Sequence, residues 1–495
     1  MWKPAIGGMA LFLAALVGQV SAAPLVSPTA GSDQIRAART VSAADDLVFT
    51  YTRTVTAKGR PVSADTGTVI LGADFTAIDQ AADHTLDDFA LCRVLSWKTG
   101  ATDVDNQSCF YMPAFRLAEL SNRQALNRML TGAMESKKVP ESLAPYWAEQ
   151  ELSVQDAPTD PLKIHTGATT VDYSLNGRVV VRTSLAGTAF AADQRQRVAR
   201  YLARHVDLHP QVLRAILASG QVPSDIIIER YQADQPNTET LHFTALSHQV
   251  RDYPLPPHLT AALVTTAKGD SIEARGLKQA LAVMDGTVQP PKPDFETLMG
   301  RLEVAVDGKQ AMAATLLFQE LASEYGGSLL SDATRMARLK AVMPRLQVLF
   351  AEPDSARFMQ AAELAGDSKA TPQNEAAARY LSEAKGLDAM PFGTFRYVTF
   401  ANLVRASGDI SGWDKGIFSA MPALPDCYWT HIAAYPWIGN TYKDMGDLAY
   451  GDFQLDKAWQ AWDLGRAVDS DWRKDTLQSV AEYEDSLRAA LPDDF

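Results

Sequence analysis

The sequence contains few cysteines and none of the short motifs that mark the commonest nucleotide-binding and serine-hydrolase sites. Its three cysteines are Cys92, Cys109 and Cys427, and their spacing does not match a zinc-binding pattern. A glycine-rich phosphate loop, a dinucleotide-binding fingerprint and a Gly-x-Ser-x-Gly elbow are all missing. These absences exclude enzymes that depend on such motifs. They leave open hydrolases, such as glycosidases, whose catalytic carboxylates carry no local signature.

An excess of positive charge is also missing. The chain has 46 Lys and Arg residues against 59 Asp and Glu residues, which gives a net charge of −13. Because such a surface repels phosphate backbones, we expect no nucleic-acid partner. Long apolar runs are absent after the N-terminal segment, so we expect no membrane insertion. The hydrophobic fraction of 46% over 495 residues is enough to bury the cores of two or three domains.

The first 22 residues are typical of a secretory signal peptide. Lys3 precedes the apolar stretch 5–17, and the small residues Val-Ser-Ala at 20–22 fit signal peptidase. A membrane anchor is the alternative, but the stretch is shorter than the roughly 20 residues that span a bilayer. We therefore expect cleavage near Ala22 and a periplasmic or secreted protein. Residues 23–45, rich in Ala, Ser and Thr, are expected to form a flexible leader.

Residues 46–255 are predicted to form an α+β domain with an antiparallel sheet. Asn176-Gly177 favours a tight hairpin turn between the flanking strands. Runs of β-branched and aromatic residues predict strands at 47–55, 66–71, 171–175, 178–182, 226–231 and 240–244. Apolar periodicity predicts helices at 114–134, 194–205 and 211–219.

Residues 256–294 are predicted to be a helical connector that ends in a proline-rich linker, and 295–495 a purely helical domain. The linker prediction comes from the prolines at 290–293. The expected helices are 258–268, 270–285, 309–325, 328–350 with a break at Pro344, 354–366 and 373–386.

The C-terminal helical region contains two stretches that resemble a tetratricopeptide (TPR) repeat. Residues 438–447, Ile-Gly-Asn-Thr-Tyr-Lys-Asp-Met-Gly-Asp, resemble its first helix, and 457–469 resemble its second. The segment 402–409 gives a further, shorter match at a spacing close to the family's period of about 34 residues. The turn between the two helices is longer than in the family.

The resemblance implies a helical hairpin and a protein-binding scaffold. Tyr442, Ala458 and Trp462 are expected to fill the inner face of the hairpin, and Gly446 to end its first helix in the left-handed conformation. No peptide-clamping residue is implied.

A cluster of aromatic residues provides the candidate binding site. Tyr428, Trp429, His431, Tyr435 and Trp437 lie close together in the sequence, and among the C-terminal aromatic residues they are the best candidates for exposure to a ligand or partner. Core packing is the alternative, because large aromatic side chains dominate protein cores.

The cysteines predict one disulfide in an oxidising compartment. Cys92 and Cys109 fall in the neighbouring apolar runs 89–95 and 109–112, and pairing of these runs as strands would bring the two cysteines together. Three unpaired, buried cysteines are the alternative. Cys427 would remain free.

Three short patterns partly match known catalytic or metal sites. Asp65-Thr66-Gly67 has the letters of an aspartic-protease site but no apolar strand before it and no second copy. Ser382-Glu383-Ala384-Lys385 and Lys98-Thr99-Gly100 occur in the reverse order from penicillin-recognising enzymes. His205 and His209 have a metal-ligand spacing, but Pro210 disturbs the helix there. We predict no metal and no cofactor.

Three functions remain open. The first is an exported scaffold that binds another envelope or secreted protein. The second is an exported hydrolase with its site between the two domains. The third is a carrier of apolar ligands that uses the N-terminal sheet.

Overall fold

A computed structural model provides the structure of the protein. It describes residues 26–39, 45–57, 59–135, 162–175, 178–206, 208–232, 235–267, 269–289, 294–353, 355–356, 424–434, 436–468 and 474–495. The predicted signal peptide, the predicted helix 373–386 and the shorter TPR match at 402–409 lie outside these residues, as does nearly all of the predicted helix 354–366.

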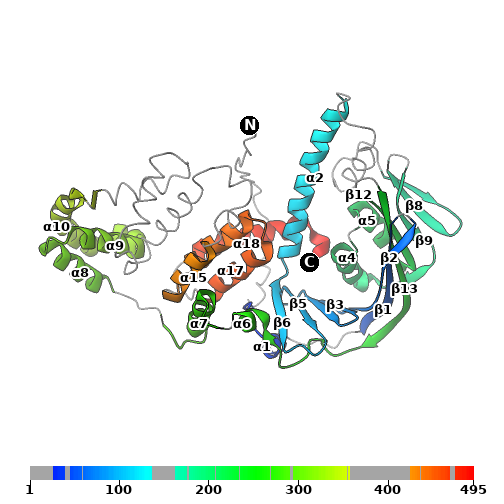
Figure 1. Ribbon diagram of the computed structural model, residues 1–495, viewed down its shortest axis with the longest axis horizontal. Coiled ribbons are helices and arrows are strands. Elements are labelled where there is room, and N and C mark those ends of the chain that lie inside the picture. The colour runs from blue at the N-terminus through cyan, green and yellow to red at the C-terminus, as the bar shows by residue number, and fades with distance from the viewer. Residues whose placement is uncertain are drawn as a thin grey trace.

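A sheet of twelve strands dominates the N-terminal half (Figure 1). Its order is β14-β6-β5-β4-β3-β2-β1-β13-β12-β9-β8-β7, and β14 and β6 are the parallel pair among antiparallel neighbours. The strands are β1 (Asp45–Ala57), β2 (Arg60–Leu71), β3 (Phe75–Gln80), β4 (Asp83–Asp88), β5 (Arg93–Lys98), β6 (Asp103–Ser108), β7 (Lys163–Thr166), β8 (Thr170–Leu175), β9 (Arg178–Ser184), β12 (Asp225–Gln232), β13 (Gln235–Val250) and β14 (Thr260–Ala261). A separate small sheet pairs β10 (Gly187–Ala189) with β11 (Gln221–Pro223).

The described helices come before, within and after the sheet. They are α1 (Ser32–Ala38), α2 (Tyr111–Glu135), α4 (Arg195–His205), α5 (Pro210–Ser219), α6 (Ala262–Thr266), α7 (Ile272–Met284), α8 (Phe295–Asp307), α9 (Ala311–Ser331), α10 (Ala333–Phe350), α15 (Leu424–Ala434), α16 (Gly439–Gly451), α17 (Leu455–Val468) and α18 (Lys474–Ala490), with short 3-10 turns η2 (Ala192–Gln194) and η5 (Pro492–Asp494).

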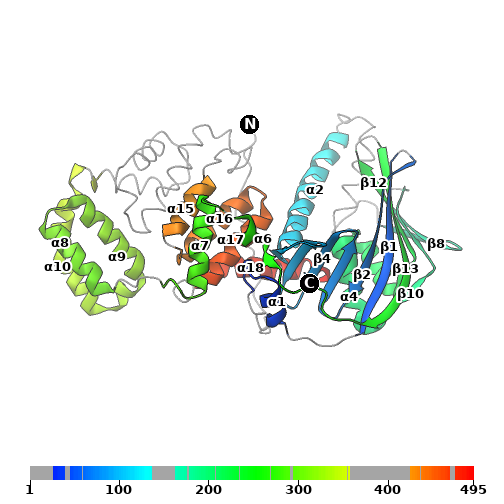
Figure 2. The ribbon, with the colours of Figure 1, turned by 60° about the horizontal axis from the view of Figure 1, so that its bottom comes forward.

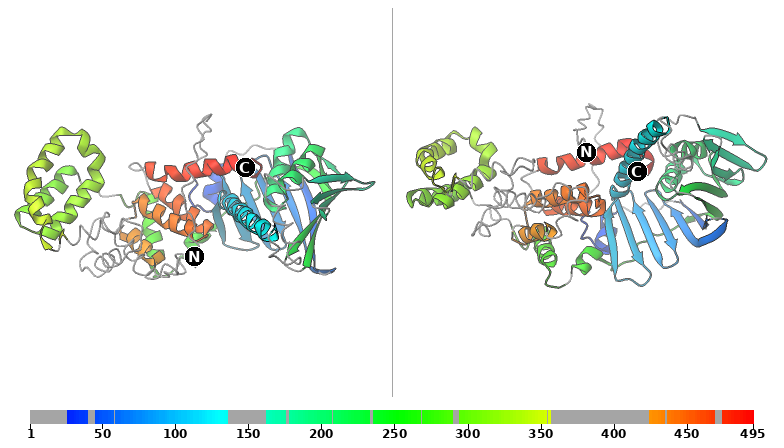
Figure 3. Two further views of the ribbon diagram at one scale, coloured as in Figure 1. Left: turned by 90° about the horizontal axis from the view of Figure 1, so that it is seen from above. Right: turned by 45° about the horizontal axis from the view of Figure 1, so that its top comes forward.

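The two faces of the first strands are both buried. Successive residues of a strand point to opposite faces, so Phe49 of β1 packs against α4 and α5, whereas Val48 packs on the other side. The ring of Phe49 lies edge-on to that of Tyr201, with centroids 5.4 Å apart. Helices α4 and α5 therefore occupy the concave face that a carrier of apolar ligands would leave open (Figure 3).

The outer face of β1–β6 is covered by the segment predicted to be a flexible leader. That segment contains α1, whose Ile35 is fully buried in a core with Tyr253 and Leu255. Arg39 follows α1 and forms a buried ion pair with Asp88, whose carboxylate also accepts a hydrogen bond from Tyr253, 2.6 Å away. The prediction of a flexible leader is therefore wrong for residues 26–39, which buried Ile35, the ion pairs of Arg39 and the hydrogen bonds of Arg36 to the Tyr253 and Leu255 carbonyls hold against the sheet.

The C-terminal helices form two separate groups (Figure 2). Helices α8–α10 share their own core, centred on Leu298, Leu302 and Leu346. The other group is α15–α18, in which α15 packs against α7, and α17 packs against α2 and β6. Helices α15–α18 lie between the group α8–α10 and the sheet (Figure 2). Among the described helices, none combines the length and the apolar character that crossing a bilayer requires.

The predicted fold class is confirmed: an α+β region with a large antiparallel sheet is followed by a helical region. The hairpin prediction is also confirmed, because β8 and β9 pair with Leu175 opposite Arg178. Several local predictions are wrong. The predicted helix 258–268 is shorter, because Thr260–Ala261 form β14 and α6 begins at Ala262. Helix α10 continues through Pro344, held by buried Val342, Leu346 and Leu349. Residues 109–112 do not form a strand, since α2 begins at Tyr111.

Candidate functional site

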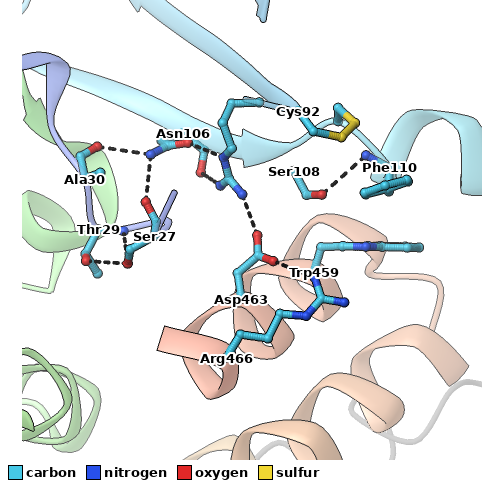
Figure 4. Close-up of polar contacts among 12 residues, drawn as sticks. Ser27, Thr29, Ala30, Cys92, Asn106, Ser108, Phe110, Trp459, Asp463 and Arg466 are labelled. Carbon is cyan, nitrogen blue, oxygen red and sulfur yellow. Dashed lines mark hydrogen bonds and ion pairs between the residues drawn. A yellow bond between two sulfur atoms is a disulfide. The ribbon is translucent and has the colours of Figure 1, made fainter. Parts of the chain in front are cut away.

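A chain of buried polar contacts joins the C-terminal helices to the sheet (Figure 4). Arg93 of β5 forms an ion pair with Asp463 of α17, and both side chains are almost fully buried. The Arg93 guanidinium also donates to the Asn106 side chain at 2.7 Å and to the Asn106 carbonyl at 2.9 Å. Asn106 in turn donates to the carbonyls of Ser27 and Ala30. One arginine thus connects the N-terminal segment, the sheet edge and α17.

The chain of contacts continues into α18. Arg466 makes two hydrogen bonds of 2.9 Å to Glu484, and the Trp459 indole donates to the same carboxylate at 3.0 Å. Buried charges are costly unless each one is paired, and these groups all find partners. The sheet and helices α17 and α18 therefore share a buried interface, as the elements of a single domain do.

An apolar core surrounds these polar contacts. Phe110, at the start of α2, packs on Trp459, with ring centroids 6.4 Å apart, and on Phe495, 5.3 Å away. Cys92 and Cys109 form a disulfide beside this core, with Cα atoms 4.8 Å apart. The predicted cysteine pair is confirmed. The bond fixes the end of β6 immediately before α2 begins.

A groove opens beside this core. Its volume is about 350 Å³, within the usual range for ligand sites. The β6 strand supplies Asp105 and Gln107, the start of α2 supplies one wall, and the turn between α16 and α17 supplies the other. The remaining lining residues are Tyr111, Met112, Phe115, Phe453, Leu455 and Asp456.

Large apolar side chains of the groove face solvent. The exposed fractions are 44% for Met112, 50% for Phe115 and 63% for Phe453. Isolated exposed apolar residues are common on protein surfaces, but a cluster around a hollow marks an interaction site. The groove is therefore the strongest candidate site in the described part of the chain.

Phe453 has an unusual backbone conformation. Its φ angle is +59°, and it follows the end of α16, where Gln454 donates to Ala449 and Phe453 donates to Tyr450. This pattern is the helix end at which glycine is preferred, because a side chain costs energy in the left-handed region. A bulky aromatic residue that is both strained and exposed contributes little to the fold, which points to a role at the surface.

The groove carries negative charge. Among the described residues, Asp105 and Asp456 are its charged lining residues. Partial burial raises the pKa of Asp105 above its ordinary value, and the nearby Asp456 carboxylate raises it further. The Asp105 carboxylate is open to solvent at the mouth of the groove, although the walls exclude part of the surrounding water. Burial also raises the pKa of Tyr111, with Asp87 and Asp105 adding to the effect.

The aromatic residues predicted to bind a partner are mostly buried. The exposed fractions of Tyr428, Trp429 and His431 are 4%, 8% and 3%. Trp429 packs against Gly276 of α7, where an added Cβ would lie 2.8 Å from the ring. These three candidates are therefore part of the core: Tyr428 and Trp429 pack between α15 and α7, and His431 bonds to Thr441 of α16 at 3.0 Å. Trp437 is half-buried, and Tyr435 lies outside the described residues.

The short catalytic patterns do not come together. Asp65 and Gly67 lie within β2. Gly67 faces Tyr51 of β1, and its lack of a side chain makes room for the Tyr51 ring. His205 bonds to Asp87 at 2.8 Å, while His209 caps α5 by accepting from the Gln211 amide. Residues 382–385 lie outside the described residues. No group of three or more potential metal ligands is found among the residues that the structure describes.

The TPR-like segment forms a helical hairpin of α16 and α17. Tyr442, Ala458 and Trp462 are buried in it, as expected. Gly446 does not end the first helix, which continues to Gly451; instead an added Cβ there would lie 2.3 Å from the Trp462 indole. The residues beyond Gly446 lengthen α16 and carry Phe453 to the groove. That the hairpin is a TPR repeat stays a prediction.

Sequence reasoning missed the groove. Asp105, Phe115 and Phe453 sit in unremarkable local patterns and come together only when α17 docks on β6. The sequence offers one indication of the groove. Phe453 stands just after the end of a helix, at a position where glycine is common. No family model matches the chain, and no curated protein matches it in sequence. The groove's geometry is therefore the basis for a functional proposal.

Proposed function

We propose that this protein is exported and acts as a scaffold that binds a segment of another envelope or secreted protein in the groove between β6, α2 and the α16–α17 turn. The observation that carries this proposal is the exposed apolar lining of the groove, above all the strained and exposed Phe453. The signal-like N-terminus supports export, and the Cys92–Cys109 disulfide suits an oxidising compartment.

Aromatic and methionine side chains are enriched at protein interfaces. A groove with apolar walls on two sides suits an extended segment with bulky apolar side chains. Because its walls come from both the sheet region and the C-terminal helices, a fragment of the chain would present only half of the site. The intact chain is therefore the form to test.

Site-specific photo-crosslinking tests the proposal. A photoreactive phenylalanine analogue placed at Phe453 or Phe115 is expected to crosslink one protein in an envelope extract. The same analogue at Val304 of α8, which is 70% exposed, is the matched control and should not capture that protein. Equal capture from all three positions, or none from the groove positions, would contradict the proposal.

A hydrolase with its site in the same groove is the second candidate. The supporting observation is the raised pKa of Asp105 beside a second carboxylate, an arrangement typical of acid–base catalysis. A panel of glycoside, ester and peptide substrates would test it. Turnover by the intact chain that is lost in Asp105→Asn, and retained in the exposed control Asp270→Asn, would replace the scaffold proposal with this one.

A further inference from the structure

Two carboxylates of the groove have no cationic partner among the described residues. Asp105 lies on β6, and Asp456 lies in the first turn of α17. Among the described residues, the only side-chain hydrogen bond to Asp105 comes from Gln107, at 3.0 Å. No described basic residue lines the groove. Two like charges in a partly desolvated hollow are unfavourable until a cation joins them.

Arg93 of β5 does not supply that cation. Arg93 acts on Asp105 electrostatically, but its guanidinium is committed to Asp463 and Asn106 inside the junction. The negative charge of the groove is therefore left for a ligand to neutralise.

The apolar lining fits the rest of a basic side chain. Lysine and arginine pack their long stems on apolar surface while the charged head stays with polar groups, and aromatic faces attract cations. Phe115, Phe453 and Met112 supply such surface next to the two carboxylates. A free metal ion would use the carboxylates but would gain nothing from these side chains.

We propose that the groove recognises a lysine or arginine side chain of the bound protein segment, with its charged head between Asp105 and Asp456 and its stem along Phe453 and Phe115. This inference rests on the proposed function. It specifies that the groove recognises a basic side chain of the partner. The partner segment would therefore carry a basic residue next to bulky apolar ones.

Acidification should weaken this recognition. The groups that face Asp105 are Asp456 on α17, Tyr111 on α2 and Arg93 on β5, with Gln107 on its own strand. Protonation of Asp105 removes one of the two charges that hold the cation. Because its pKa is raised, that loss begins at a higher pH than for an ordinary exposed aspartate.

The test uses a phage-displayed library of random 12-residue peptides, selected on the intact protein. Enriched peptides are expected to carry Lys or Arg within two positions of an aromatic or long aliphatic residue. One enriched peptide is then labelled, and its affinity is measured by fluorescence anisotropy against a copy with norleucine in place of the basic residue. Wild type should prefer the basic peptide by about tenfold.

Variants connect the preference to the two carboxylates. The preference should fall to about onefold in the double variant Asp105→Asn, Asp456→Asn, and persist in Asp270→Asn, an exposed control outside the groove. Thermal unfolding midpoints equal to wild type would show that the double variant is folded. Equal affinity of wild type for the two peptides would overturn the inference while leaving the proposed function standing. No enrichment of any peptide would overturn both.

Discussion

Phe453 combines two features that ordinarily oppose each other in a stable protein: it is an exposed aromatic residue, and its backbone is left-handed. Replacing it with glycine removes the backbone strain and loses little buried surface, because 63% of the residue is exposed. We expect Phe453→Gly to raise the free energy of unfolding by about 0.5–1 kcal/mol, measured by urea denaturation. The same variant should lose photo-crosslinked or peptide partners of the groove.

Phe453→Ala is the matched control for this prediction. Alanine removes the ring but keeps a Cβ in the left-handed region, so binding should fall with no gain in stability. A Phe453→Gly protein that is less stable than wild type would show that the ring supports the fold after all.

Asp87 is a buried carboxylate on the inner face of β4. Burial opposes its ionisation, but the charges of Arg204 and His205 and their hydrogen bonds outweigh that cost and lower the pKa of Asp87 to about 2. We expect Asp87→Asn to reduce the free energy of unfolding by about 3–5 kcal/mol at neutral pH, because Arg204 would be left buried without its partner.

The pH dependence follows from the same shift. A carboxylate whose folded pKa lies below its unfolded value stabilises the fold above the unfolded value, 3.8. That stabilisation is lost as the pH falls from there toward 2. The difference between wild type and Asp87→Asn in urea should therefore shrink between pH 6 and pH 3. A constant difference would contradict the assignment.

At the scale of elements, the disulfide holds one wall of the groove. It closes a loop with a sequence separation of 17 residues, and a crosslink of that size stabilises a fold by about 3 kcal/mol. We expect the double variant Cys92→Ala, Cys109→Ala to lose about this much in urea denaturation. Because Cys109 immediately precedes Phe110 and Tyr111, the variant should also bind groove ligands less tightly. Unchanged stability on reduction of the wild type would contradict this role.

The helices were predictable where an apolar face repeats over many turns. The predictions for 309–325 and 328–350 correspond to α9 and α10, and the caps of α7 and α8 are an ordinary serine and aspartate, Ser271 and Asp294. Strands β3, β4 and β6 were not predicted, and β5 was predicted only in part, from the apolar run around Cys92. Strand β4 reads Asp-His-Thr-Leu-Asp-Asp, which carries no strand propensity of its own. Its two last aspartates are buried only because Arg204 and Arg39 come to them from distant segments.

The candidate site was not predictable from local pattern. The aromatic cluster at 428–437 was a real signal, but of the packing between α15 and α7, because a helix that presents Tyr428, Trp429 and Ile432 to a neighbour forms a core. The groove joins residues near 105–115 to residues near 453–456. A site of this kind can be predicted from a sequence only when it is already known that its two parts pack together.

At the scale of the whole molecule, the structure predicts which fragments fold alone. Helices α8–α10 have their own core and their own ion pairs, including Arg338 with Glu303. We expect a fragment of residues 294–353 to be helical and to unfold cooperatively by circular dichroism. A fragment of residues 424–495 should not, because Trp459 would lose Phe110 and Asp463 would lose Arg93. Cooperative unfolding of the second fragment would show that the junction is dispensable.

The Arg93–Asp463 ion pair can form only late in synthesis of the chain. Its partners are 370 residues apart, and at ordinary rates of synthesis roughly 20–70 s pass between the appearance of one and the other. Throughout that interval Arg93 lacks Asp463 and Phe110 lacks Trp459. The edge of the newly made sheet therefore exposes a charged and an apolar side chain that are buried in the finished protein. The chain is therefore expected to be most prone to aggregate just before its last two helices are complete.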